Sequence, residues 1–257
     1  MKAMILAAGN GVRLRPFTNT QPKVLAPLNG VPQLQLVLNW LRAYGISEVA
    51  INLHHLGEQI ADFCGDGSKF DMRITYSKEE QLLGTAGGVK KLQEFFDDTF
   101  IVVYGDILTD LNLNKMIMFH RLKKSFATIL VQPLDDPRGT GIIQMREDGQ
   151  IIDFVEKPPF EAKSGALTNA AIYILEKGVF DYIQDNDNAD FGHHIFPELI
   201  RSGIDIFGYI LSHNEYLIDI GNWKHYQRAC EDIRVGKVNV FHDNYTDSKF
   251  DSAALRR

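Results

Sequence analysis

Short apolar runs of strand length alternate with helical patterns through the first half of the chain. The runs expected to form strands are residues 2–8, 48–53, 72–77, 99–106 and 125–132. The helical patterns between them cover residues 32–45, 57–64, 85–96 and 112–124. Strands that alternate with helices predict a mostly parallel sheet with helices on both faces, which is an α/β fold.

The pattern changes after Pro133. Residues 141–145 and 151–157 predict a β-hairpin that turns at Asp148 and Gly149. The remaining predicted strands are residues 168–175, 204–210 and 215–221, and the predicted helices are 178–184, 193–201 and 222–234. We therefore expect a single domain over residues 1–234 that changes character near residue 132, followed by an appendage or tail at 235–257.

Composition narrows the classes of function. The 257 residues carry 27 Lys and Arg against 33 Asp and Glu, a net charge of −6. This balance argues against a nucleic-acid binder, because neutralising phosphates needs a basic surface. The two cysteines, Cys64 and Cys230, have no metal-binding spacing and suit buried positions in a reducing compartment. The apolar start breaks at Gly9, so we expect no membrane span and a cytoplasmic protein.

The segment from Leu6 to Leu28 carries the strongest chemical signal. Gly9 and Gly11 follow the first strand, where glycines allow close approach of the backbone to a phosphate. Arg13 and Lys23 add positive charge. Leu14 occupies the place of the third glycine in the dinucleotide-binding motif, which argues against NAD.

In its full form, GNGVRLRPFTNTQPK, this segment resembles the signature of the sugar-1-phosphate nucleotidylyltransferases. Five further matches follow in the family's order: LLGTAGG, VVYGD, FVEKP, NAAIYIL and YLIDIG. The subgroup that the chain most resembles contains the mannose-1-phosphate and heptose-1-phosphate guanylyltransferases. The resemblance covers residues 1–234 and implies a Rossmann-like, mostly parallel mixed sheet with a small antiparallel part. It also implies a nucleotide half at about 1–132 and a sugar-binding half at about 133–234.

The family's reaction joins a nucleoside triphosphate and a sugar 1-phosphate to give a nucleotide sugar and pyrophosphate. The nucleophile is already an anion, so positioning and charge neutralisation would supply most of the catalysis. The resemblance implies that Arg13 holds the β- and γ-phosphates and that Lys23 contacts the phosphates near the reacting centre. The nucleotide-binding positions that it implies are Leu6, Ala8, Gly9, Gly11, Glu80, Gln81, Gly84 and Thr85.

Two aspartates are candidates for binding Mg²⁺. Asp106 follows a buried strand, at the edge of the sheet where α/β proteins bind ligands, and a carboxylate suits this hard cation. An aspartate there could also simply cap the next loop. The resemblance makes Asp106 one magnesium ligand and Asp219 of YLIDIG the second.

Two loops are expected to recognise the substrates. LLGTAGG opens a helix, so its N–H groups and Thr85 would face a ligand, or Thr85 would cap the helix. Glu80 could accept hydrogen bonds from guanine, or Glu79 and Glu80 could both point to solvent. The resemblance assigns the sugar phosphate to Lys157 and the sugar hydroxyls to Glu156, with Gly141 and Asn169 as further sugar contacts.

The leading hypothesis is transfer from GTP to a mannose-type or heptose-type sugar 1-phosphate. The alternatives are a dTDP-glucose or UDP-glucose pyrophosphorylase and a non-catalytic subunit that binds nucleotide sugars. The expected partners are these small molecules, and we expect neither nucleic acid nor a membrane as a partner. The sequence leaves open whether the chain forms a homo-oligomer. The pairs His54–His55 and His193–His194 lack the spacing of metal ligands, so loop and surface roles are expected. Asn222, where the family often has Thr, could cap the last helix.

Overall fold

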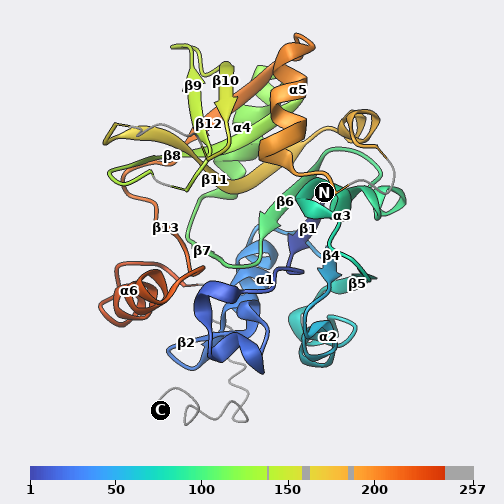
Figure 1. The fold of residues 1–257 in the computed structure, drawn as a ribbon, viewed down its shortest axis with the longest axis vertical. Helices are drawn as coiled ribbons and strands as arrows, with labels where there is room; N and C mark the ends of the chain where they lie inside the picture. The colour runs from blue at the N-terminus through green and yellow to red at the C-terminus, as the bar shows by residue number, and fades with distance from the viewer. Residues whose placement is uncertain (138, 158–162, 185–187, 241–257) are drawn as a thin grey trace. The chain divides into compact units, whose positions relative to one another are not determined.

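The computed structural model describes residues 1–137, 139–157, 163–184 and 188–240. The chain forms two compact units, whose elements are labelled in Figure 1. We call residues 2–81, 104–111 and 213–240 the parallel unit, and residues 82–103 and the described residues of 112–212 the hairpin unit. From residue 2 to residue 240 the chain passes between the units four times.

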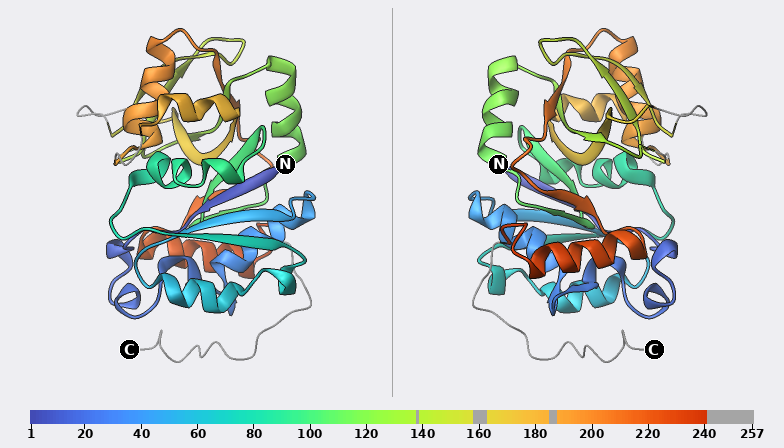
Figure 2. Two further views of the ribbon diagram at one scale, coloured as in Figure 1. Left: turned by 90° about the vertical axis from the view of Figure 1, so that its right-hand side faces the viewer. Right: turned by 90° about the vertical axis from the view of Figure 1, so that its left-hand side faces the viewer.

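The parallel unit is built on three parallel strands, β1 (Lys2–Leu6), β4 (Glu48–Leu53) and β5 (Arg73–Lys78). Ala3 lies opposite Val49, which in turn lies opposite Ile74. β1 and β4 are apolar and almost wholly buried, as expected of parallel strands covered on both faces. Helix α2 (Gly57–Cys64) packs on β4 and β5 (Figure 2).

The rest of the parallel unit consists of one long buried helix, two short strand pairs and a closing helix. These elements are α1 (Gln33–Ala43), β2 (Pro27–Leu28) with β3 (Val31–Pro32), β7 (Ile107–Thr109) with β13 (Leu217–Asp219), and α6 (Trp223–Arg234). An apolar cluster joins α6 to the first segments of the chain through residues such as Leu14, Ile220 and Tyr226. This cluster holds β13 beside β7.

The hairpin unit is mainly antiparallel. β11 (Ala166–Leu175) pairs antiparallel with β6 (Phe100–Tyr104), β8 (Ala127–Leu134) and β9 (Ile142–Met145). β9 forms the predicted hairpin with β10 (Ile151–Val155), and Gly149 in its turn has φ +90°. β12 (Ile206–Ile210) adds parallel to β8.

Helices lie on both sides of this sheet. α4 (Leu113–Lys123) packs on β8 and β12, α5 (Phe196–Arg201) packs on β10, and Figure 2 shows them on opposite faces. α3 (Gly84–Lys90) completes the unit. The α/β class and the mixed sheet are thus confirmed, with a larger antiparallel part than expected.

Three predicted helices differ from the observed ones. The helix expected over 85–96 ends at Lys90, because the glycine pair Gly87–Gly88 gives it little intrinsic stability. Residues 177–182 form a 3₁₀ helix, and α5 is preceded by a π turn at Phe191–Ile195. The short strands β2, β3 and β7 carry no recognisable pattern and were not predicted.

Cys64 and Cys230 are free thiols and form no disulfide. Burial raises the pKa of the Cys64 thiol to about 12, so this thiol behaves as an apolar core group. Cys230 is half-buried. In the described part of the chain, no helix has the length and apolar character that crossing a bilayer requires.

Candidate active site

The turn after β1 uses its two glycines for different purposes. Gly11 has φ +61°, and a side chain there would collide with Thr18 and Lys23. The Thr18 hydroxyl donates to the Gly11 carbonyl over 2.8 Å, which fixes the turn. Gly9, by contrast, faces open space. Gly9 is therefore the glycine that could allow a ligand to approach the backbone, and Gly11 shapes the turn.

The strand end before this turn is anchored inside the protein. Ala7 and Ala8 are buried, and the Ala7 N–H donates to Asn52 Oδ1 over 2.7 Å. The Leu6 carbonyl accepts from Gly105 N–H over 2.9 Å. These contacts hold the end of β1 in place, so the backbone that follows it, including Ala8 and Gly9, has a defined position.

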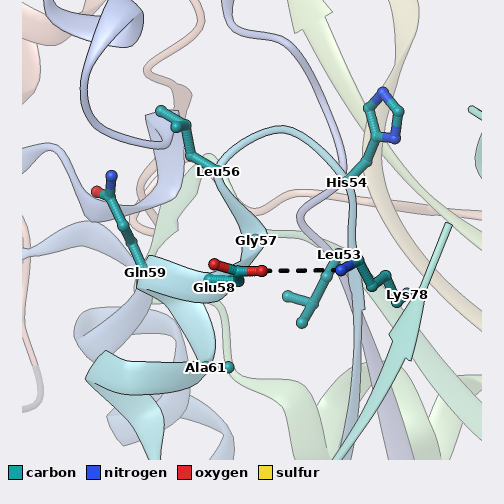
Figure 3. Close-up of a pocket in the computed structure, with 8 residues that line it drawn as sticks. All are labelled: Leu53, His54, Leu56, Gly57, Glu58, Gln59, Ala61 and Lys78. Atoms are coloured by element: carbon teal, nitrogen blue, oxygen red, sulfur yellow. Dashed lines mark ion pairs between the residues drawn. The ribbon is translucent and has the colours of Figure 1, made fainter. Parts of the chain in front are cut away.

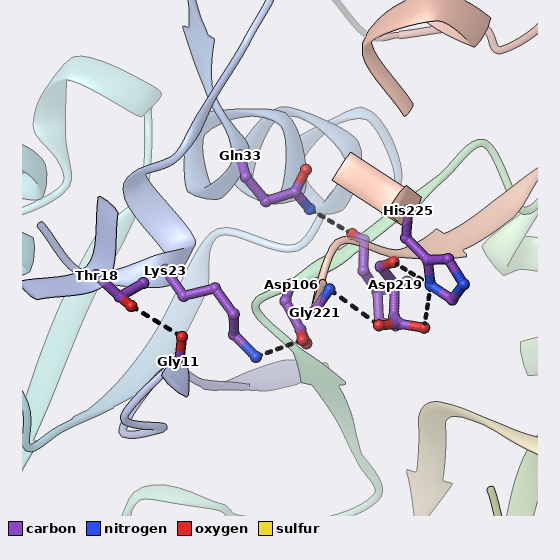
Figure 4. A network of polar contacts seen from close by, with 9 residues as sticks. Gly11, Thr18, Lys23, Gln33, Asp106, Asp219, Gly221 and His225 are labelled. Carbon is purple, nitrogen blue, oxygen red and sulfur yellow. Dashed lines mark hydrogen bonds and ion pairs between the residues drawn. The ribbon is translucent and has the colours of Figure 1, made fainter. Parts of the chain in front are cut away.

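Lys23 and Asp106 form an ion pair. Lys23 Nζ donates to Asp106 Oδ2 over 2.5 Å, and both side chains are largely buried (Figure 4). The lysine comes from a 3₁₀ turn at Lys23–Leu25 and the aspartate from the bend between β6 and β7. The structure therefore brings together two predicted site residues that lie 83 positions apart in the sequence.

Asp219 lies next to Asp106 on a neighbouring strand. In the β7–β13 pair, Asp219 is opposite Ile107, and the Ile220 N–H donates to the Asp106 carbonyl over 2.9 Å. Gln33, which is fully buried, donates from Nε2 to the Ile107 carbonyl and ties this pair to α1 (Figure 4). Two strands thus hold the two predicted metal ligands side by side.

The Asp219 carboxylate is oriented by its own turn. Its Oδ1 accepts from Gly221 N–H over 2.9 Å, and His225 Nδ1 lies 3.0 Å from Oδ2 and 3.1 Å from the Asp219 carbonyl (Figure 4). Both partners of this nitrogen are acceptors, so Nδ1 carries the proton. His225 is held in turn by Asn222, whose side chain accepts from the His225 N–H and caps α6 as predicted.

Arg13 extends over the same turn. A side chain on Gly221 would lie 2.8 Å from Arg13 Nη2 and 2.6 Å from Asp219 Oδ1, so glycine leaves the room that both groups occupy. Trp223, which follows, donates from its ring N–H to the Arg15 carbonyl. It packs on the cluster beside α6.

These residues fit a divalent cation of the magnesium type. Among the residues that the structure describes, no group of three or more His, Cys, Asp or Glu side chains could hold a metal by itself. Magnesium commonly binds through one or two carboxylates and completes its shell with water and substrate phosphates. Asp106 and Asp219 match that donor set, with Lys23 placed to balance charge.

The loop before α3 differs from the expectation. Glu80 and Gln81 are exposed, whereas Glu79 is buried and accepts from Asn52 Nδ2 over 2.8 Å. The alternative in which Glu79 points to solvent is therefore wrong. Asn52 joins the Ala7 N–H to the Glu79 carboxylate, so one buried amide connects the phosphate turn to this loop.

The first N–H groups of α3 form hydrogen bonds with another segment of the chain. The N–H groups of Ala86 and Gly87 donate to the Ala189 carbonyl over 2.9 and 3.1 Å. Gly84 has φ +74°, and a side chain there would collide with Ala189. The N–H groups of Ala86 and Gly87 are therefore directed at a neighbouring loop and not at a ligand. The predicted contacts of Gly84 and Thr85 with the nucleotide stay predictions.

Thr85 does not cap α3 either. Its hydroxyl donates to Asp190 Oδ2 over 2.9 Å and accepts from Phe191 N–H over 3.0 Å. The residue at the cap position is Leu83, which offers no side-chain hydrogen bond. Thr85 therefore connects α3 to the π turn within the hairpin unit.

Three of the four predicted sugar-binding residues converge in the hairpin unit. The Asn169 N–H donates to the Gly141 carbonyl over 2.9 Å, and Glu156 Oε2 lies against Gly141. The Asn169 side chain bonds to Ala171 N–H and to the Tyr173 hydroxyl at a bulge in β11. Lys157 is exposed and has φ +45°, a strained conformation of the kind found at functional positions.

Glu156 has an unusual electrostatic environment. Burial raises the pKa of this carboxyl, and the nearby Asp190 raises it further, against the lowering effect of His193 and Lys157. A carboxylate kept in such surroundings is a candidate functional group.

Sequence reasoning missed several supporting residues. Asn52 and Gln33 act through contacts between distant segments, which no local pattern reveals, and His225 acts on Asp219, which lies six residues before it. Asp190 and Gly192 belong to none of the family motifs quoted above. The pair His54–His55 has a structural role, because these side chains form hydrogen bonds with the carbonyls of Glu79 and Thr18.

A separate pocket lies at the carboxyl ends of β4 and β5 (Figure 3). Its lining is largely apolar, and the Lys78–Glu58 ion pair crosses it at 3.8 Å. None of the predicted site residues lines this pocket. Its residues are Leu53, His54, Leu56, Gly57, Glu58, Gln59, Ala61 and Lys78.

Comparison with known proteins identifies the class. Residues 2–235 match the family model described as nucleotidyl transferase, and the chain belongs to this family. It is 38% identical, over 91% of its length, to a UTP–glucose-1-phosphate uridylyltransferase of Synechocystis sp.. It is 31% identical, over 90% of its length, to a mannose-1-phosphate guanylyltransferase of Mycobacterium tuberculosis. The chain spans 63% and 64% of these two relatives.

The fold agrees with this assignment. A putative glucose-1-phosphate thymidylyltransferase from Bacillus anthracis superposes with a TM-score of 0.79 at 25% identity, covering 91% of this chain and 95% of the other. The named relatives are thus all sugar-1-phosphate nucleotidyltransferases, although their names differ in base and sugar.

Proposed function

We propose that this protein transfers a nucleotidyl group from a nucleoside triphosphate to a sugar 1-phosphate. The observation that carries the proposal is the Lys23–Asp106 ion pair beside Asp219, built from three distant segments after the Gly9–Gly11 turn. This arrangement supplies a cation and two hard anionic ligands at one place in a member of the nucleotidyl transferase family.

In the proposed reaction, a phosphate oxygen of the sugar 1-phosphate attacks the α-phosphorus of the triphosphate. The bond from the α-phosphorus to the bridging oxygen breaks, and pyrophosphate leaves with the electron pair. Because the attacking oxygen is already ionised, no general base is needed. Arg13 and Lys23 neutralise the phosphates of the nucleotide, Lys157 holds the sugar phosphate, and Glu156 accepts hydrogen bonds from the sugar hydroxyls.

Asp106 and Asp219 would hold Mg²⁺, which when bound neutralises charge on the phosphates. Lys23 keeps the Asp106 carboxylate in place over 2.5 Å. His225 and Gly221 do the same for Asp219.

We propose GTP as the preferred nucleotide and a mannose-type or heptose-type sugar phosphate as the acceptor. The acidic loop supports GTP, since the exposed Glu80 could accept from guanine N1–H and N2–H. UTP is the second candidate, because a relative at 38% identity is named for UTP and glucose 1-phosphate.

A pyrophosphate-release screen tests both levels of the proposal. The purified chain is assayed with GTP, ATP, CTP, UTP and dTTP against mannose, heptose and glucose 1-phosphates. We expect release only when both substrates are present. We also expect EDTA to abolish release and excess Mg²⁺ to restore it. No release with any pair would refute the activity. A higher kcat/KM for UTP than for GTP would overturn only the choice of base.

The Glu80 contact has its own control. Glu80→Gln should lower kcat/KM for GTP more than for UTP, because only guanine offers the paired donors. Glu94→Gln, on an exposed position of the hairpin unit, should leave the ratio unchanged.

A further inference from the structure

The Glu156 carboxylate is enclosed by two glycines from different parts of the hairpin unit. A side chain on Gly141 would lie 2.5 Å from Glu156 Oε2, and one on Gly192 would overlap the same oxygen and lie 3.0 Å from Cδ. Neither glycine has a positive φ. Backbone conformation therefore does not require glycine at either position. At Gly192 the space is taken by Glu156, and at Gly141 it is taken by Glu156 and the Phe154 ring.

The turn that carries Gly192 is rigid. Asp190 Oδ1 accepts from the N–H groups of Gly192 and His193 over 2.9 and 3.2 Å. Phe191 is fully buried and packs on Tyr173 and Phe196. Gly192 is thus fixed by hydrogen bonds on one side and aromatic packing on the other.

The same turn is fastened to α3. Thr85 donates to Asp190 Oδ2 and accepts from Phe191 N–H, and Ala189 accepts from two N–H groups of α3. Asp190 therefore places its charge near Glu156 while holding the turn, which agrees with the electrostatic environment of Glu156 described above. The position of the carboxylate is set by the whole turn and not by its own hairpin alone.

We propose that Gly192 is a specificity-determining residue, which positions the Glu156 carboxylate to select the hydroxyl pattern of the sugar 1-phosphate. The inference rests on the proposed function. A carboxylate confined on two sides cannot swing to follow a hydroxyl of changed orientation. It should therefore discriminate between epimeric sugars, because a misplaced hydroxyl leaves the buried acceptor unpaired.

The test is Gly192→Ala, which adds one methyl group at the carboxylate. We expect KM for the preferred sugar 1-phosphate to rise about tenfold, as for loss of one hydrogen bond to a charged group. KM for the nucleoside triphosphate should stay unchanged. The ratio of kcat/KM values for mannose 1-phosphate and glucose 1-phosphate should move towards one.

A double-mutant cycle separates this role from general damage. In a Glu156→Ala background, Gly192→Ala should have no further effect on KM for the sugar phosphate, because the group it displaces is gone. Gly178→Ala is the matched control, since it crowds Phe126 in the same unit and lies away from Glu156. It should alter thermal stability without changing the sugar ratio.

Failure of the inference about Gly192 and failure of the proposed function give different results. An active wild-type enzyme with an unchanged sugar ratio in Gly192→Ala overturns the inference alone, as does an equal loss in the Glu156→Ala background. A wild-type protein that releases no pyrophosphate with any substrate pair overturns the function itself. If Gly192→Ala does not fold, Gly141→Ala, which crowds the same carboxylate oxygen and also the Phe154 ring, must show the same change in ratio.

Discussion

At the residue scale, the orientation of the Asp219 carboxylate depends on Gly221, the last residue of the motif YLIDIG, and on His225, which lies outside that motif. His225 fixes one carboxylate oxygen and Gly221 the other. Partners of this kind orient a metal ligand and tune its affinity. The motif YLIDIG locates the carboxylate in the sequence, but the helix that follows it determines which way the carboxylate points.

The first prediction concerns His225. His225→Ala should weaken binding of divalent cations about tenfold, because outer partners of metal ligands typically matter to this degree. His225→Asn keeps an N–H near the position of Nδ1 and should retain most of the affinity. Mn²⁺ binding measured by electron paramagnetic resonance, without turnover, distinguishes them. Equal affinity in all three proteins would contradict an orienting role.

The second prediction concerns Glu156. Burial and Asp190 raise the pKa of this carboxyl, so folding favours its neutral form. Its contribution to stability therefore falls as the pH rises from the ordinary glutamate range through the raised pKa. Glu156→Gln cannot ionise, so it should unfold at a higher temperature than wild type at pH 8.

The difference in unfolding temperature should vanish below the ordinary glutamate pKa, where wild-type Glu156 is also neutral. Thermal unfolding from pH 4 to pH 8 checks this dependence. Glu147→Gln, at an exposed position, serves as the control and should follow the wild-type curve. A stabilisation of Glu156→Gln that is equal at every pH would contradict the electrostatic origin.

At the element scale, a local signal explains the start of two helices, α4 and α6. Asn222 caps α6, and Asn112 caps α4 in the same way, with its side chain accepting from Lys115 N–H. α3 has no such cap, and the Ala189 carbonyl takes its first N–H groups. A helix capped by its own sequence can be predicted, whereas one capped by a distant loop cannot.

The third prediction tests the α6 cap. Asn222→Ala should lower the free energy of unfolding by about 1 kcal/mol, the usual cost of losing an N-cap. Asn222→Asp retains the acceptor and should retain the stability. Urea unfolding measures both, with Lys224→Ala in the same turn as an exposed control. A loss as large in the aspartate variant would show that capping is not the cause.

At the scale of the whole molecule, the predicted substrate contacts are divided between the units. Arg13 belongs to the parallel unit, together with both aspartates and Lys23, while Lys157 belongs to the hairpin unit with Glu156. The two substrates should therefore respond to different substitutions.

The fourth prediction follows from this division. Arg13→Ala should chiefly weaken nucleotide binding and Lys157→Ala chiefly sugar-phosphate binding, each by tenfold or more for loss of a charged hydrogen bond. Separate calorimetric titrations with each ligand provide the measurement. Arg15→Ala and Lys163→Ala, nearby exposed residues of the same charge, are the controls. Equal losses of both ligands in both variants would refute the assignment.

The sequence by itself determined the longer strands, most helices, the α/β class and the positions of the chemical groups along the chain. Those features follow from periodicity and from local chemistry: β4 and α2 occupy the predicted ranges, and Asn222 caps α6 as expected. Their physical causes act over a few residues along the chain, so one segment contains all the information.

Only the tertiary structure decided which groups meet and which are already satisfied. Lys23 forms an ion pair with Asp106, which lies 83 residues further along the chain. The Thr85 hydroxyl donates to Asp190, which lies 105 residues away. Glu79 is buried and accepts from Asn52, whereas its neighbour Glu80 is exposed. Burial and hydrogen bonding depend on the packing of segments that are distant in sequence. A motif can therefore name a donor or a carboxylate, but the fold determines whether it is directed at a ligand or at the protein.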